Sequence, residues 1–237
     1  LSSLDLSNNN LLEFIMVAQN PQLTNLNISN LPNLAVNGEE LFFQNNYNLT
    51  NVNATNSGSG NPTTWWFDNN QINLLNITGA KMTNLLIHDN ALVNLDLTGC
   101  DSLKQLVCVR NQLTSLDLSD ATELIELYCD DNQLISLDVR NGNNTNFASF
   151  HASNNSNLYC VSVDDAAWST ANWTGGSFSF DAQTSFSDDC ASFVLGPTAS
   201  FSASPTTVCL GDAITFTDAS TGSPTSWSWD FGDGNSS

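Results

Sequence analysis

Two neighbouring stretches, SLKQLVCVRNQLTSLDLSDA (residues 102–121) and ELIELYCDDNQLISLDVRNG (residues 123–142), align with each other without a gap. Both have the form L-x-x-L-x-C-x-x-N-x-L-x-x-L-D-L/V, and each ends in a polar bend. Self-similarity at a period near 20 residues indicates a solenoid, in which every copy buries its apolar side chains against the next copy. The repeat therefore decides the fold of most of this chain.

The asparagine of the repeat recurs along the chain at intervals of roughly 20 to 26 residues, which predicts about seven turns. An asparagine at the end of each strand can satisfy backbone groups of a buried bend, because its amide both donates and accepts hydrogen bonds. We therefore interpret these residues as structural and call them the Asn ladder. Its members are Asn20, Asn46, Asn70, Asn90, Asn111, Asn132 and Asn155.

Each turn contains two short segments, LxC and LDL, in which apolar and polar residues alternate. Alternation with a period of two over three to five residues predicts strands, and neither segment is long enough for a helix. The inward Leu, Ile and Val side chains of one turn should meet their equivalents about 4.8 Å further along the axis. The expected fold class is mainly β, with two narrow strands in each turn of a solenoid.

The pattern LxxLxC/LxxN with LxxLDL resembles the leucine-rich repeats of bacterial extracellular proteins, and its 21-residue form is similar to that of internalin-type surface proteins. The resemblance covers residues 1–163 and implies a leucine-rich-repeat solenoid whose concave strand face binds a ligand. Two features depart from it: the insertion TNSGSGNPTT (residues 55–64), and cysteine in the strand at Cys108 and Cys129 alone. Other turns place apolar residues there, so we expect both cysteines to be buried thiols. These residues are Val17, Phe43, Phe67, Ile87 and Ala152.

Residues 164–195 break the repeat and bring in several aromatic residues, as a cap over the last coil requires. These are Trp168, Trp173, Phe178, Phe180 and Phe186. Cys160 lies in the last recognisable coil and Cys190 closes the segment, with no other cysteine between them. We predict a disulfide between them, and two free thiols are the alternative. The segment resembles the C-terminal cap of secreted bacterial leucine-rich repeats, which supports the disulfide.

Residues 196–237 have a different composition, with alternation in ITFTD (214–218) and WSWDF (227–231) between Pro, Gly and Ser turns. This pattern predicts the start of a β-sandwich. The stretch SWSWDFGDG (226–234) resembles the signature of PKD domains, which are immunoglobulin-like modules of secreted and cell-surface proteins. The resemblance implies a linker and the N-terminal half of such a domain, with Trp227 and Trp229 on one face and Ser228 and Asp230 on the other. Cys209 has no evident partner.

The outward side of the Asn-bearing strand carries an apolar or aromatic residue in every turn. We call this set the apolar column; it comprises Met16, Phe42, Trp66, Leu86, Val107, Tyr128 and His151, and it is flanked by Gln44, Asp68, His88, Arg110 and Asp130. The other strand instead presents a solvated polar column of Asp5, Asn27, Asn53, Asn76, Asp96, Asp117, Asp138 and Ser162. A contiguous exposed apolar stripe is typical of a surface that binds a protein or a sugar. The alternative is that these side chains pack only on one another across turns.

Four Lys and Arg against 24 Asp and Glu give a formal charge of −20, which disfavours nucleic acid and anionic membranes as partners. No apolar run could cross a membrane directly, and we expect the signal sequence to lie outside this stretch. We find no catalytic motif; the two histidines, His88 and His151, are expected three turns apart, too far to share a metal. No acidic pair has the ligand spacing of a calcium loop, so we expect neither metal nor cofactor.

These observations predict a non-catalytic extracellular module that recognises a protein or a glycan through the apolar column. Two alternatives stay open. The repeats could form a structural stalk or a self-association element, in which case the apolar column would be buried between copies. They could also be an accessory module of a secreted enzyme whose catalytic domain lies elsewhere. The sequence does not indicate the oligomeric state.

Overall fold

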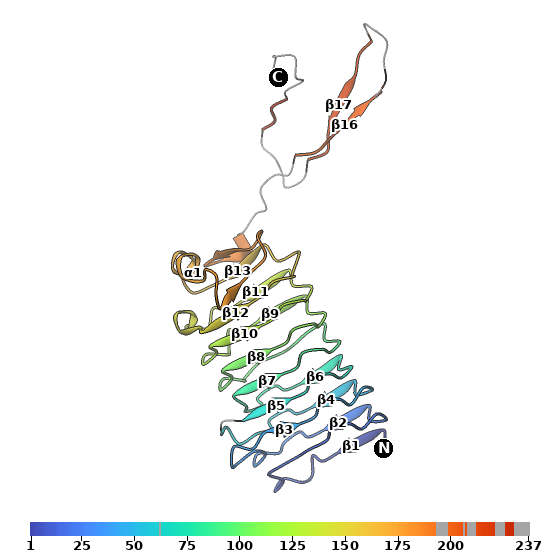
Figure 1. Cartoon of the computed structure of the whole chain (residues 1–237), viewed down its shortest axis with the longest axis vertical. Coiled ribbons are helices and arrows are strands. Elements are labelled where there is room, and N and C mark those ends of the chain that lie inside the picture. The colour runs from blue at the N-terminus through green and yellow to red at the C-terminus, as the bar shows by residue number, and fades with distance from the viewer. Residues whose placement is uncertain (62, 193–198, 206, 208–211, 221–225, 230–237) are drawn as a thin grey trace. The chain divides into compact units, whose positions relative to one another are not determined.

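The computed structural model describes residues 1–237 except 62, 193–198, 206, 208–211, 221–225 and 230–237 (Figure 1). The chain divides into two compact units, Leu1–Ala191 and Ser192–Ser237. The first unit is a β-solenoid and contains the residues of the Asn ladder, both columns and residues 164–191 of the predicted cap. The predicted boundary between residues 163 and 164 stays a prediction, and the one between 195 and 196 falls outside the described residues.

One side of the solenoid is a seven-stranded parallel sheet in the order β14-β12-β10-β8-β7-β5-β3. Its strands are β3 (Leu41–Phe42), β5 (Thr64–Trp66), β7 (Asn84–Leu86), β8 (Gln105–Val107), β10 (Glu126–Tyr128), β12 (Ser149–His151) and β14 (Phe178–Ser179). An isolated parallel bridge between Met16 and Phe42 adds a further rung. The solenoid therefore has about eight turns, rather than the predicted seven.

The other strand of each turn lies in one of two four-stranded parallel sheets. The first contains β1 (Ser3–Asp5), β2 (Asn25–Asn27), β4 (Asn51–Asn53) and β6 (Leu74–Asn76), and the second contains β9 (Ser115–Asp117), β11 (Ser136–Asp138), β13 (Cys160–Ser162) and β15 (Ser185–Ser187). A single bridge from Asn76 to Asp96 continues the first sheet. Two narrow strands per turn are thus confirmed.

The core is a stack of equivalent apolar side chains, as the alternation predicts. Along the seven-stranded sheet, Leu41, Trp65, Leu85, Leu106, Leu127 and Phe150 are paired in register and are all fully buried. Cys108 and Cys129 are also fully buried and are free thiols. Loss of hydration raises the pKa of the Cys108 thiol to about 12. Both side chains therefore pack as small hydrophobes.

The Asn ladder holds one bend of every turn together. Asn132 is typical: its Nδ2 donates to the carbonyls of Cys129 in its own turn and Cys108 in the preceding turn, and its Oδ1 accepts from the amide of Leu113. The residue before each ladder asparagine has a positive φ, between 53° for Arg110 and 61° for Asn45. Such bends leave carbonyl groups without a strand partner, and the asparagine amide satisfies them. Asn20 differs, because it is exposed and its amide donates to Ala18.

The predicted cap both covers the core and extends the solenoid. Strands β14 and β15 pair in parallel with β12 and β13, so residues of the cap add one more rung to each side. The helix α1 (Ala166–Asn172) is capped at its N-terminus by Asp165, whose carboxylate accepts from the amide of Trp168. The buried Trp173 is the centre of an aromatic cluster that covers Phe150. The other rings against Trp173 are Phe147, Trp168, Phe178, Phe180 and Phe186.

The predicted disulfide is present and joins the last coil to the end of the cap. Cys160 in β13 and Cys190 at the start of a short 3-10 helix, η2 (Cys190–Ser192), are bonded across a separation of 30 residues. A second 3-10 helix, η1 (Asn144–Asn146), lies in the bend before β12. The cross-link closes the cap over the solenoid end, which restricts the conformations of the unfolded chain.

The second unit contains one antiparallel pair, β16 (Phe201–Ser204) and β17 (Thr215–Asp218). The ITFTD segment therefore forms the predicted strand, whereas residues 226–229 form no strand. Trp229 nonetheless packs against the rings of Phe201 and Phe216, while Trp227 is exposed. Cys209 and Asp230 lie outside the described residues.

Candidate functional site

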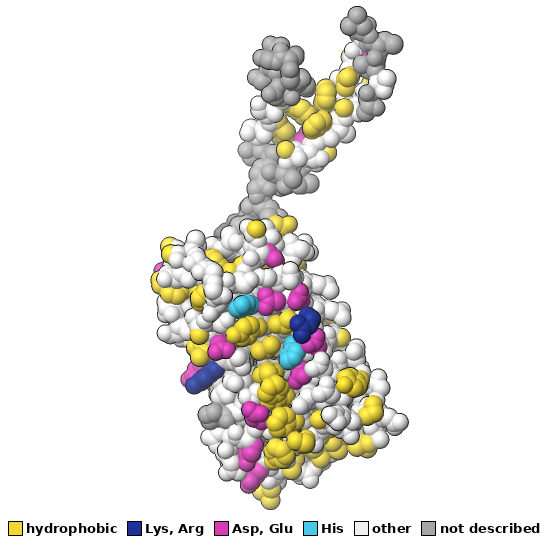
Figure 2. All heavy atoms as spheres, in the orientation of Figure 1, with side chains coloured by type: hydrophobic (Ala, Val, Ile, Leu, Met, Phe, Trp, Pro, Cys, Tyr) yellow, Lys and Arg dark blue, Asp and Glu magenta, His cyan; other side chains and the backbone are white. Residues whose placement is uncertain are grey.

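The structure aligns every member of the apolar column in a single register. Phe42 pairs with Trp66, Trp66 with Leu86, and the series continues through Val107 and Tyr128 to His151. Met16 joins the column through its bridge to Phe42 and is 62% exposed, and the other members are partly exposed. Figure 2 shows the resulting apolar stripe running along the solenoid, with acidic side chains on both sides. Such a continuous stripe can bury apolar surface of a partner.

Ring contacts within the column explain part of its sequence. Phe42 and Trp66 are stacked with centroids 6.4 Å apart, and Tyr128 and His151 are stacked at 5.1 Å. Neighbouring aromatic rings on adjacent strands stabilise a sheet without any ligand. This self-packing accounts for pairs of neighbours, but it leaves the outer surface of the column in contact with solvent. The column therefore has both features: its side chains pack on one another across turns, and they present an apolar surface to solvent.

Four of the five predicted flanking residues line one side of the column. Each lies two residues after the column member of its turn, so the alternation of the strand puts it on the same side as that member; these residues are Gln44, Asp68, His88 and Asp130. Backbone hydrogen bonds between turns maintain this register: the amide of Asn45 donates to the carbonyl of Asp68, and the amide of Arg110 donates to that of Asp130. Arg110 is displaced: Val109 occupies the flanking position of its turn, and Arg110 lies in the left-handed bend one residue later. Arg110 directly precedes Asn111, whereas the other flanking residues lie two positions before their ladder asparagine.

Arg110 forms an ion pair with Asp89 of the preceding turn. Its guanidinium donates two hydrogen bonds to the carboxylate of Asp89, at 2.5 and 2.7 Å, and these hold the pKa of Asp89 below its ordinary value. The two residues occupy the same bend position on adjacent turns. Asp130 has the opposite environment, because burial raises the pKa of its carboxyl even though it accepts a hydrogen bond from the amide of Ser153.

Three flanking side chains have a buried polar atom with no hydrogen-bond partner within the described protein. They are Gln44 (Oε1), Asp68 (Oδ1) and His88 (Nδ1), which follow one another on three adjacent turns. Asp68 is only 7% exposed, and its other oxygen accepts from Asn69. Nε2 of His88 is 3.9 Å from Oδ2 of Asp68. The sequence pattern identifies these residues as flanks, but it gives no sign that their polar atoms lack partners.

The polar column on the other sheets is satisfied internally. Asp5 accepts from the amide and hydroxyl of Ser7, and Asp96 and Asp117 accept from the backbone amides two residues later. The same short-range hydrogen bond recurs at Asn27, Asn53, Asn76 and Asp138. These side chains form turns at the ends of their strands. The polar column thus has a local structural role.

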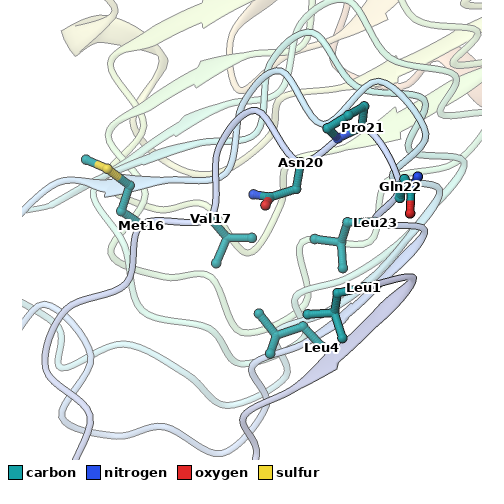
Figure 3. A pocket seen from close by; sticks show the side chains of 8 residues that line it. All are labelled: Leu1, Leu4, Met16, Val17, Asn20, Pro21, Gln22 and Leu23. Atoms are coloured by element: carbon teal, nitrogen blue, oxygen red, sulfur yellow. The ribbon is translucent and has the colours of Figure 1, made fainter.

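Near Met16, the solenoid has a hollow of about 490 Å³. Figure 3 shows Leu1, Leu4, Val17 and Leu23 pointing towards one another there, while Met16 points away. Asn20, Pro21 and Gln22 complete its lining. A second hollow of about 420 Å³ lies over the polar column between Ser3 and Asn76. Neither hollow gathers a set of catalytic groups.

The described residues contain no group of three or more His, Cys, Asp or Glu side chains placed to hold a metal ion. His88 lies on the turn of β7, and His151 lies on β12, three rungs further along the seven-stranded sheet. Within the same described residues, no helix is long and apolar enough to span a membrane.

Fold and site together define a β-solenoid with an exposed apolar stripe, a disulfide-closed end and a second, separate β unit. Residues 198–237 match the family model of the PKD domain. No curated protein and no solved structure matches the chain. The solenoid and the PKD match fit an extracellular adhesion or structural module, and the disulfide fits the oxidising environment outside the cell.

Proposed function

We propose that this chain is a non-catalytic binding or adhesion module, secreted or displayed on a cell surface, that recognises a protein or a glycan through the apolar column. The observation that carries the proposal is the column itself, which keeps apolar and aromatic side chains partly exposed on every turn of one face. If strand propensity alone explained the apolar column, the outward position of the other strand should also carry apolar side chains. That position instead carries Asp, Asn and Ser.

The repeat pattern supports a more specific identity. We propose that residues 1–163 are a leucine-rich-repeat solenoid of the bacterial internalin type, residues 164–195 its cap and residues 196–237 the start of a PKD domain that acts as a spacer. The strong negative charge supports a partner other than nucleic acid or an anionic membrane. No direct insertion into a membrane and no catalytic step is part of this proposal.

The experiment compares the whole chain with two double variants that each remove two large apolar side chains. The first variant, Trp66→Ser with Tyr128→Ser, removes aromatic rings of the apolar column. The control, Leu74→Ser with Ile135→Ser, removes exposed residues outside the column, with exposed fractions of 61% and 63%. Each protein is tested by sedimentation velocity and on arrays of defined oligosaccharides and of purified surface proteins.

A parent chain that is monomeric and binds a defined array component supports the proposal if the column variant loses binding and the control keeps it. A parent chain that dimerises, with dimers abolished by the column variant alone, contradicts it in favour of a self-association element. Equal loss of binding in both variants also contradicts it, because the column would then have no special role.

A further inference from the structure

The Lys and Arg residues of this chain are all engaged in ion pairs, which constrains the kind of partner that the apolar column can take. The sequence contains four such residues. Lys81 pairs with Asp101 at 2.6 Å, Lys104 with Glu123 at 3.4 Å, Arg110 with Asp89 at 2.5 Å and Arg140 with Asp138 at 2.5 Å. Four basic residues against 24 acidic ones leave most of the negative charge of the chain unbalanced.

Several of these acidic residues lie beside the apolar column. Asp68, Asp130 and Asp131 follow it on one side, and Glu126 precedes it on the other. Their hydrogen-bond donors are neutral: Asn69 for Asp68, the amide of Ser153 for Asp130, Asn154 for Asp131 and Gln105 for Glu126. Neutral donors leave the negative charge of a carboxylate in place. The rim of the column is consequently acidic on both sides, as Figure 2 shows.

Asp68 adds an independent observation at the same place. Its side chain is nine-tenths buried, yet Oδ1 has no hydrogen-bond partner among the described residues. On the preceding turn, Oε1 of Gln44 is also buried and also lacks a hydrogen-bond partner there. Both atoms are acceptors, so only a donor can satisfy them. A buried acceptor left without a donor costs about 1–3 kcal/mol, which a bound N–H group can offset. Ammonium and guanidinium groups supply such donors, and their positive charge compensates the negative charge of the rim.

We propose that the partner of the apolar column is a cationic protein segment in which Arg or Lys alternates with apolar residues. The apolar residues contact Phe42, Trp66 and Leu86, and the basic residues contact Asp68 and the other carboxylates of the rim. This inference rests on the proposed function and specifies its ligand. Charge complementarity favours such a segment over a neutral glycan, for which an acidic rim adds no attraction.

The test uses the whole chain and three synthetic 12-residue peptides, in which Leu alternates with Arg, Leu alternates with Glu, or Ser alternates with Arg. Binding is measured by fluorescence anisotropy. The double variant Asp68→Asn with Asp130→Asn removes two charges beside the apolar column and keeps the acceptor atoms that bind Asn69 and Ser153. The control, Asp96→Asn with Asp117→Asn, removes the same charge from the polar column.

We expect the Leu-Arg peptide to bind at least ten times more tightly than either other peptide. The Asp68/Asp130 variant should weaken that binding at least tenfold and the Asp96/Asp117 control less than twofold. Added salt should weaken it as well, because ions screen exposed charges over about 10 Å at 0.1 M. Equal weakening in the two variants overturns the inference, since binding would then reflect net charge alone.

The same proteins separate this inference from the function on which it rests. If an oligosaccharide of the array binds, requires Trp66 and Tyr128, and is unaffected by the Asp68/Asp130 variant, the cationic partner is wrong and the binding face stands. If neither peptide nor array component requires Trp66 and Tyr128, both proposals fail.

Discussion

Changing Asn132 to Asp tests how much the Asn ladder contributes to the stability of the solenoid. The substitution keeps the Oδ1 that accepts from the amide of Leu113 at 3.0 Å, but it removes the Nδ2 that donates to Cys108 at 3.0 Å and Cys129 at 3.1 Å. The carbonyl of Cys108 keeps a hydrogen bond from Asn111, and that of Cys129 keeps one from Asn155, so neither is left without a donor. Two lost hydrogen bonds at about 1 kcal/mol each should lower the free energy of unfolding by roughly 2 kcal/mol. The new carboxylate also faces both carbonyl oxygens.

Urea unfolding of the whole chain, followed by far-ultraviolet circular dichroism, measures this loss. Asn20→Asp is the matched control, because it introduces the same charge at the same ladder position. Asn20 is exposed and its amide donates only to Ala18, at 2.9 Å, so the control should lose less than about 1 kcal/mol. Losses of similar size in the two variants would refute the idea that the ladder acts through its buried carbonyls.

Three further predictions concern the disulfide, a rim carboxylate and the thiols. Replacing both Cys160 and Cys190 by Ser should lower the free energy of unfolding by about 3.6 kcal/mol, the loop entropy of a 30-residue cross-link, and a thermal midpoint unchanged from the parent would contradict this. The folded pKa of Asp130 is raised above its ordinary value of 3.8, so between these two values the folded state binds more protons than the unfolded chain and stability falls as pH rises. Asp130→Asn should therefore be more stable than the parent at neutral pH, with the gap closing below pH 3.8, and a gap that widens on acidification would show the opposite sign. Iodoacetamide should modify the three free thiols in urea but not in the native protein, because burial shields them and raises their pKa; these are Cys100, Cys108 and Cys129. Peptide mass mapping measures the modification, and labelling of Cys108 or Cys129 in the native state would contradict their place in the core.

The repeat makes most of the solenoid predictable. A two-residue alternation identifies which side chains point inward, and a fixed distance from the ladder asparagine sets the register between turns. These two rules are enough to place Phe42, Trp66 and Tyr128 in one column. They also identify the slot in which Cys108 and Cys129 are buried.

The exceptions have physical causes. Residues 164–195 lack the Leu and Asn pattern, so the sequence predicts a cap there and does not reveal that β14 and β15 continue both parallel sheets. Arg110 directly precedes its ladder asparagine and occupies the left-handed bend position of Asn45 and Asn69, whereas Asp68 lies two residues before its own ladder asparagine. The partnerless atoms of Gln44 and Asp68 depend on side-chain rotamers, which no repeat pattern specifies.

Oxidative footprinting tests most directly whether the apolar column is the binding face. The whole chain is labelled with hydroxyl radicals with and without the Leu-Arg peptide or an oligosaccharide that binds on the array, and oxidation is measured by mass spectrometry. Tyr47, which is 61% exposed and outside the column, is the internal reference. We predict that Met16, Trp66 and Tyr128 lose labelling on binding while Tyr47 keeps it. Unchanged labelling of all three column residues in a saturated complex would contradict a binding role for the column.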